Sequence, residues 1–209
     1  MIFILMVTFL SFSISSCNDP EETTITEKQE QEENTDETDP STSKSLNLVV
    51  FYSWSGNTKH IAERIAYLTN AEKYEIRTVK SYPKDGYETA DISMAERRTQ
   101  HLPDLVDDFP DLSKFDTIYI GGPIWNAYMP TPLEAYLKIA DFTGKTVIPF
   151  STSQGSGQRG FQQDFEKMVR NPKSIGEYKD IRFPDNYSPE TYSNSEIDTL
   201  LKDWLKNKY

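Results

Sequence analysis

Residues 47–209 alternate between two patterns of apolar and polar positions. Short apolar runs bounded by polar residues are typical of buried strands, and they lie at 47–53, 74–79, 116–122, 145–151 and, more weakly, 177–183. Stretches with apolar residues at every third or fourth position predict helices at 61–68, 87–98, 131–140, 157–170 and 195–208. Because strands and helices alternate, we predict an α/β domain built on a parallel, doubly wound sheet.

Two of the predicted helices begin with cap signals. The run Thr131-Pro132-Leu133-Glu134 matches a capping box, and so do Ser193 and Glu196. In such a box the hydroxyl and the carboxylate each accept a hydrogen bond from an otherwise unpaired N–H group at the helix start. The last helix has an apolar face that we expect to pack in the core, formed by Ile197, Leu200, Leu201, Trp204 and Leu205.

The first 17 residues have the features of an export signal. Residues 2–10 are almost entirely apolar, but this stretch is shorter than the roughly 20 residues that a membrane span needs. The segment Ile14-Ser15-Ser16-Cys17 resembles the lipobox of bacterial lipoproteins, in which the cysteine is acylated and becomes the mature N-terminus. We therefore predict a signal peptide at 1–16, lipidation of Cys17, and export to a bacterial membrane, at its periplasmic face or at the cell surface. Because residues 1–16 contain no Lys or Arg, a misassigned start and a free buried thiol stay open as alternatives.

Residues 17–46 are predicted to form a disordered acidic tether. The part from 18 to 43 contains ten acidic residues and one basic residue, a composition that cannot bury enough apolar surface to fold. This segment carries most of the net charge of −11, so the predicted domain at 47–209 is close to neutral. Without a basic excess we expect no nucleic-acid partner. The single cysteine excludes an internal disulfide.

The segment Phe51-Tyr52-Ser53-Trp54-Ser55-Gly56-Asn57-Thr58 joins the first predicted strand to the first predicted helix. A turn of this kind directs free backbone N–H groups and the positive end of a helix dipole at one point, which suits a phosphate. Ser53, Ser55 and Thr58 add hydroxyl groups, and Gly56 permits close approach of the backbone. An ordinary capped turn is the structural alternative.

Two further loops follow predicted strands. In a doubly wound sheet, ligands bind at the carboxyl ends of the strands, near the point where the strand order reverses. The loop at 121–130 holds Trp125 and Tyr128 between prolines, and such rings are poor choices for an exposed turn unless they cover something flat. The loop at 151–160 is rich in small residues, which let backbone groups approach a ligand.

The third loop also contains a glycine pattern with a different meaning. Gly155, Gly157 and Gly160 have the spacing of a dinucleotide-binding fingerprint, and Asp180 follows the last glycine by 20 residues. That fingerprint belongs to the first strand–helix unit of a domain, and here the Ser53–Thr58 turn occupies this place. We therefore favour the simpler interpretation, in which the glycines allow close approach to a ligand.

The Ser53–Thr58 turn resembles the phosphate-binding loop of flavodoxins, and the loops at 121–130 and 151–160 resemble the flavin-contacting loops of that family. The resemblance covers roughly residues 47–170. It implies a flavodoxin-like three-layer sandwich, a five-stranded parallel sheet in the order 2-1-3-4-5, and FMN as cofactor. The cofactor-binding residues that it implies are Ser53, Trp54, Ser55, Gly56, Asn57, Thr58, Pro123, Ile124, Trp125, Asn126, Thr152, Ser153, Gly155, Ser156 and Gly157.

The resemblance also implies roles for single residues. Trp125 is the preferred candidate for stacking on the flavin, with Trp54 and Tyr128 as rivals. Asn126 stands where flavodoxins often have a glycine whose peptide faces the flavin N5, and Asn tolerates a positive φ better than most residues. His60 and His101 have neither triad nor metal-ligand spacing, so we expect no catalytic side chain and no metal site.

Three functions are compatible with these features. The first is a membrane-tethered FMN protein that exchanges electrons with a membrane-associated redox partner. The second is a flavin-dependent oxidoreductase that uses NAD(P)H and quinones. The third belongs to another class, a surface lipoprotein that keeps the fold without flavin as an interaction module.

Overall fold

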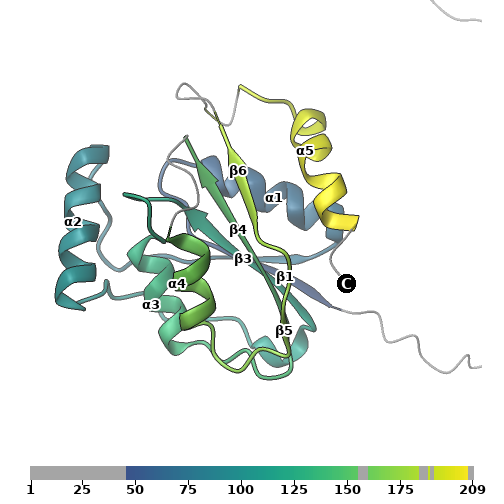
Figure 1. Ribbon diagram of the computed structural model, residues 1–209, viewed down its shortest axis with the longest axis horizontal. Helices are drawn as coiled ribbons and strands as arrows, with labels where there is room; N and C mark the ends of the chain where they lie inside the picture. The colour runs from purple at the N-terminus through teal and green to yellow at the C-terminus, as the bar shows by residue number, and fades with distance from the viewer. Residues whose placement is uncertain (1–45, 155–159, 184–187, 189–190, 207–209) are drawn as a thin grey trace, which may run out of the picture. The chain divides into compact units, whose positions relative to one another are not determined.

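The computed structural model describes residues 46–154, 160–183, 188 and 191–206. Its centre is a parallel sheet in which β3 (Thr117–Pro123) lies between β1 (Asn47–Phe51) and β4 (Thr146–Ser153). β2 (Glu72–Glu75) pairs with the other edge of β1, and β5 (Ser174–Ile175) pairs with β4. The order β2-β1-β3-β4-β5 confirms the predicted 2-1-3-4-5 topology (Figure 1).

Two short strands share the fifth position of this sheet. β5 lies beside the start of β4, and β6 (Lys179–Arg182) lies beside its end, from Phe150 to Ser153. Gly176 follows β5, and a Cβ atom there would lie 2.9 Å from Cγ1 of Ile148. The close approach of the chain to β4 therefore needs a glycine. The strand predicted at 177–183 corresponds to β6 alone.

The strands alternate their side chains between two apolar clusters, one on each face of the sheet. Leu48 and Val50 of β1 point into one cluster, whereas Val49 and Phe51 point into the other. α1 (Asn57–Thr69) and α5 (Asn194–Lys206) cover the second cluster. α3 (Thr131–Ile139) and α4 (Phe161–Met168) cover the first, with α2 (Gly86–Thr99) beside α3 (Figure 1). The described part of the domain thus has the predicted three layers.

The second strand begins and ends earlier than the predicted range of 74–79. Ile76 still donates a backbone hydrogen bond of 2.7 Å to Phe51, but the chain then leaves the sheet. Val79 N–H donates to Asp104 O at 2.9 Å, and Val106 N–H donates to Arg77 O at 2.9 Å. From Arg77 to Val79 the backbone therefore pairs with the long connection that follows α2 and not with β1.

One predicted cap is wrong and the other is confirmed. Pro130 is the N-cap of α3, and Thr131 is already helical, so the expected capping box at Thr131 does not form. The Thr131 hydroxyl donates instead to Glu96, at 2.5 Å. At α5, Ser193 N–H donates to the Glu196 carboxylate at 2.8 Å, and Glu196 N–H donates to the Ser193 hydroxyl at 3.4 Å.

The apolar face of α5 is one residue narrower than expected. Ile197, Leu201 and Trp204 are buried, but Leu200 is exposed, which corrects its placement in the core. The Trp204 ring packs edge-on against Tyr119 of β3, with centroids 6.2 Å apart. Within the described ranges, no helix combines the length and the apolarity that crossing a bilayer requires.

Candidate functional site

The carboxyl ends of β1, β3 and β4 meet at one edge of the sheet, and a cavity of about 730 Å³ opens there. All three predicted loops contribute to its lining. The contributing residues are Trp54, Ser55 and Asn57 from the first loop, Pro123, Ile124, Trp125 and Asn126 from the second, and Thr152, Ser153 and Gln154 from the third. The volume falls in the range of about 300–1,000 Å³ that is usual for small-molecule sites.

The first loop ends at a helix start that has no side-chain cap. Gly56 is the N-cap of α1, with φ at 93°, a left-handed conformation that favours glycine. Lys59 N–H donates to the Ser53 hydroxyl at 3.1 Å. Within the described residues, the N–H groups of residues 55–58 have no hydrogen-bond acceptor, and the first turn of α1 contains no acidic residue. A set of unpaired donors at the positive end of a helix dipole is thus available for an anion.

Thr58 connects the first loop to the third. The residue is 1% exposed, and its hydroxyl shares a 2.8 Å hydrogen bond with the Thr152 hydroxyl. Thr152 O in turn accepts from Ile124 N–H at 2.9 Å, which ties the second loop to the third. Thr58 is not among the lining residues of the cavity, so the contact that it makes is the link between the two loops.

The aromatic candidates take different positions. Trp54 lies at the boundary of the cavity, where its indole Nε1–H donates to Pro83 O at 2.8 Å. Trp125 also lines the cavity, and its ring is held edge-on by Tyr52 and Tyr82, with centroids 5.5 and 5.2 Å away. Tyr128 is not among the lining residues, because its ring lies under the Arg97 guanidinium, 4.4 Å from the centroid. Of the three aromatic candidates, the two indoles are the ones that line the cavity.

The second loop reverses through a tight turn at Trp125–Tyr128. The two backbones exchange hydrogen bonds of 3.0 and 2.9 Å, and both central residues are left-handed, with φ of 49° at Asn126 and 72° at Ala127. The Asn126 amide donates to Ala90 O at 3.3 Å. A left-handed Ala is strained, so this loop is held by its surroundings in a conformation that glycine would adopt more readily.

One wall of the cavity was not predicted from the sequence. It comes from the start of α2, through Asp85, Gly86, Tyr87, Thr89 and Ala90, and the opposite side is completed by Phe183 and Ser188. Asp85 is the one charged residue among the described lining residues. Its carboxylate accepts from Glu88 N–H at 2.9 Å as the N-cap of α2. The N-cap signal at Asp85 could have placed the helix start but not its position beside the first loop.

The other predicted site residues lie around this cavity or outside the described chain. Ser53 and Gly56 shape the first loop without lining the cavity. Gly155, Ser156 and Gly157 fall outside the described residues, as do the signal segment, Cys17 and most of the predicted tether. Asp180 lies in β6, where its carboxylate accepts from Ser151 at 2.8 Å and from Ser153 at 3.2 Å.

The two histidines lie apart from the cavity lining. His60 lies in α1, 3.2 Å from the side-chain oxygen of Asn194 in α5, and His101 follows α2. In the part of the chain that the structure describes, no cluster of three or more His, Cys, Asp or Glu side chains is arranged to hold a metal ion.

Comparisons with known proteins agree with this architecture. A family model described as Flavodoxin matches residues 46–181. A structure described as a putative flavoprotein, from Bacteroides uniformis ATCC 8492, is similar at 25% identity and a TM-score of 0.61, over 76% of this chain and 98% of that chain. No curated protein matches this chain.

Two solved structures from Lactobacillus acidophilus NCFM are also similar. One is a flavoprotein in complex with FMN, with 24% identity and a TM-score of 0.59 over 78% of this chain and 99% of that chain. The other is the apo-form of a flavoprotein, with 27% identity and a TM-score of 0.54 over 66% of this chain and 93% of that chain.

Proposed function

This chain belongs to the flavodoxin family, and from that premise we propose that the cavity at the ends of β1, β3 and β4 binds FMN and that the protein carries electrons. The observation that carries this proposal is the open N–H set at the start of α1. The N–H groups of residues 55–58 have no described acceptor, and no carboxylate of the first turn competes for them. A phosphate dianion is the kind of group that such a helix start stabilises.

The remaining walls suit a flat, largely apolar ring system. Trp54 and Trp125 supply aromatic surfaces, and Pro123 and Ile124 supply apolar ones. The hydrogen bond from Trp54 to Pro83 and the edge contacts on Trp125 fix both indoles before a ligand arrives. Preorganised walls lower the entropy cost of binding.

The polar groups of the cavity favour electron transfer over acid–base catalysis. When bound, FMN supplies the redox chemistry, and the protein sets its position and surroundings. The only charged group among the described lining residues is the Asp85 carboxylate, which already caps α2. Among the described lining residues, no side chain is therefore free to act as a general acid or base. An electron carrier does not need one.

The proposal is tested by titrating the purified full chain with FMN and with riboflavin, which lacks the phosphate. Asn57→Asp places a carboxylate in the first turn of α1, beside the proposed phosphate position. We expect FMN binding to weaken at least tenfold, about 1.4 kcal/mol, from charge repulsion, with riboflavin binding nearly unchanged. Asn70→Asp, at the other end of α1, is the matched control.

Two results would count against this function. If the full chain bound neither flavin, the proposal of an FMN cofactor would be wrong. If Asn57→Asp weakened the binding of FMN and riboflavin equally, the proposed position of the phosphate would be wrong. The carrier role is tested separately with the FMN-loaded protein. Sustained NAD(P)H oxidation with a quinone acceptor would show an enzyme instead of a carrier.

We also propose that the protein is exported and anchored through lipid on Cys17. The support is the apolar stretch at 2–10, the lipobox-like segment that ends at Cys17, and the acidic segment that follows. A tether of this composition keeps a domain away from the membrane surface yet within reach of a membrane redox partner. Cys17→Ser should release the protein from the membrane fraction, and an unmodified Met1 in the mature protein would contradict the proposal.

A further inference from the structure

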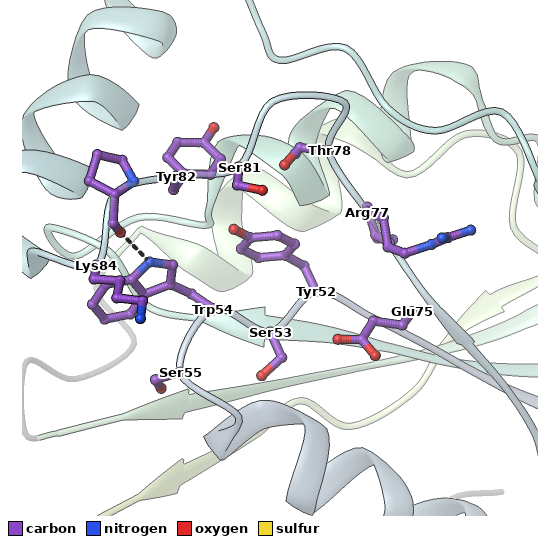
Figure 2. A pocket seen from close by; sticks show the side chains of 12 residues that line it. Tyr52, Ser53, Trp54, Ser55, Glu75, Arg77, Thr78, Ser81, Tyr82 and Lys84 are labelled. Carbon is purple, nitrogen blue, oxygen red and sulfur yellow. Dashed lines mark hydrogen bonds between the residues drawn. The ribbon is translucent and has the colours of Figure 1, made fainter.

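A second cavity, of about 520 Å³, lies beside the first loop on the side of β2 (Figure 2). Its walls are the side chains of Tyr52, Trp54 and Tyr82, with Ser81 and Lys84 at the 81–84 segment. Trp54 and Ser55 line both cavities, so the first loop forms the partition between them. The lining of this second cavity otherwise shares no residue with the cavity assigned to FMN.

The Tyr52 hydroxyl is the group that singles out this cavity. Tyr52 is 6% exposed, and within the described chain its hydroxyl has no hydrogen-bond partner. By contrast, Tyr82 donates to Glu96 at 2.7 Å, and Trp54 donates to Pro83 O at 2.8 Å. Figure 2 shows the Tyr52 ring crossing the cavity with its hydroxyl turned toward Ser81 and Tyr82 and away from Arg77. A hydroxyl that faces a cavity without a protein partner is available to a ligand, so this group is the natural recognition point.

The protonation state of Tyr52 sets what that ligand must offer. Burial, and then the nearby Glu96 and Glu75 carboxylates, raise the pKa of Tyr52. The phenol therefore stays protonated at neutral pH and donates its hydrogen. Its complement is an oxygen that accepts a hydrogen bond.

The charges at the rim are mostly neutralised within the protein. Glu75 pairs with Lys59 at 2.8 Å, and Arg77 pairs with Asp108. Lys84 is exposed at the mouth, where a single ion pair contributes little to affinity. The cavity thus selects for a neutral molecule.

We propose that this second cavity binds a small, neutral aromatic compound that carries an acceptor oxygen, with the ring among Tyr52, Trp54 and Tyr82 and the oxygen on the Tyr52 hydroxyl. Aromatic walls with one well-placed polar group are the usual composition of a small-molecule site. The acceptor oxygen can be a carbonyl or a phenolic oxygen, and the choice of probe separates these sources. The site does not depend on FMN binding.

The test uses the full chain labelled with ¹⁵N, in which the indole N–H signals of Trp54, Trp125 and Trp204 report on three positions. Acetophenone and phenol are the neutral probes, and benzoate is the anionic comparator. We expect acetophenone, phenol or both to shift the Trp54 signal saturably. The Trp204 signal should stay in place, because its indole N–H donates to Glu177 O at 2.8 Å. Binding of phenol alone would identify the acceptor as a phenolic oxygen, and binding of acetophenone alone would identify it as a carbonyl oxygen. Binding of both would show that the site accepts either.

Two variants locate the binding. Tyr52→Phe removes only the hydroxyl and should weaken binding about tenfold, the usual scale of one lost hydrogen bond. Tyr67→Phe, an exposed tyrosine on α1, is the matched control and should leave the affinity unchanged. Ser81→Phe fills the mouth from an exposed position, leaves the Tyr52 hydroxyl in place, and should abolish binding.

Four results would overturn the proposal. They are no saturable shift with either neutral probe, equal affinity in Tyr52→Phe, binding that survives Ser81→Phe, or tighter binding of benzoate than of both neutral probes. Survival in Ser81→Phe together with competition by FMN would place the probe in the other cavity. Because the titration is performed without FMN, failure of FMN binding leaves this test intact, and failure of this test leaves the FMN proposal intact.

Discussion

Arg97 is the side chain that fastens α2 to the rest of the domain. Its guanidinium pairs with Glu134 of α3, and it donates to Asp164 of α4 at 2.9 Å and to Met129 O at 3.2 Å. It also lies over the Tyr128 ring, 4.4 Å from the centroid. The Glu134 side chain is only 5% exposed, so its charge depends on Arg97 for compensation.

The size of the effect of Arg97→Ala follows from this burial. Removing one partner of a buried ion pair leaves an uncompensated charge, which costs about 3–5 kcal/mol. Because the Arg97 side chain is 21% exposed, we take the lower end of this range, about 3 kcal/mol. This figure includes the lost contact with the Tyr128 ring. We therefore expect Arg97→Ala to lower the free energy of unfolding by about 3 kcal/mol at pH 7.5, measured by urea denaturation followed by circular dichroism.

The same variant should become sensitive to pH in a definite direction. Burial raises the pKa of Glu134, and Arg97 opposes that rise. An acid whose folded pKa lies above its unfolded value contributes stability at low pH and loses it as pH rises through the folded pKa. Without Arg97 the pKa of Glu134 rises further, so Arg97→Ala should lose less stability at pH 5.5 than at pH 7.5.

Glu134→Gln in the Arg97→Ala background removes the stranded charge at nearly the same volume. It should recover most of the lost stability at pH 7.5 and abolish the added pH dependence. A loss below about 1 kcal/mol in the single variant, the scale of an exposed pair, would show that Glu134 is not effectively buried. A loss that is equal at the two pH values, or that the Gln substitution does not recover, would refute the electrostatic reasoning.

Two further predictions concern single contacts. Arg64→Ala breaks the paired hydrogen bonds of 2.8 and 2.8 Å to Asp198 and should cost about 1 kcal/mol in urea unfolding at pH 7. The hydrogen bond from Arg64 lowers the pKa of Asp198, so this contribution is present above the unfolded pKa and should fade as pH falls, whereas a pH-independent loss would contradict it. Ala127→Gly removes the strain of φ at 72° and should raise the melting temperature by a few degrees, a gain of about 0.5–1 kcal/mol. Ala135→Gly in α3 is the matched control and should instead lower the free energy of unfolding, by about 1 kcal/mol. Equal effects of the two substitutions would show that Ala127 is not strained.

The periodic pattern of the sequence was sufficient to predict most of the sheet. Residues 48–51 are all apolar, which is the signature of a strand buried on both faces, and the structure divides their side chains between two clusters. The order of the strands was not in the pattern and came from the resemblance of the loops to flavodoxins. The shift of β2 was not predictable, because Val79 is as apolar as a strand residue and only its long-range pairing with Asp104 removes it from the sheet.

The errors at β2 and at Thr131 share one physical cause, since partners distant in sequence outcompeted local ones. Thr131 has the right neighbours for a capping box, but Glu96 of α2 accepts its hydroxyl hydrogen. In the same way, Trp54 belongs to the first loop, yet its position is fixed by Pro83, 29 residues away. The cavity wall at the start of α2 could not be assigned from sequence, because Asp85 follows no predicted strand end and reaches the site only through tertiary packing.

The two walls of the main cavity are therefore held by different forces. The loops after β1, β3 and β4 are fixed by the sheet, through bonds such as Ile124 N–H to Thr152 O at 2.9 Å. The wall from α2 has no strand pairing and depends on side chains, chiefly Arg97 on Glu134 and the Trp54 indole on Pro83. Since Trp54 also separates the two cavities, a displacement of the segment at Pro83 changes the width of both at once. The Arg97 guanidinium thus supports the site in two ways, by pairing with Glu134 and Asp164 and by contacting Met129 O and the Tyr128 ring of the second loop.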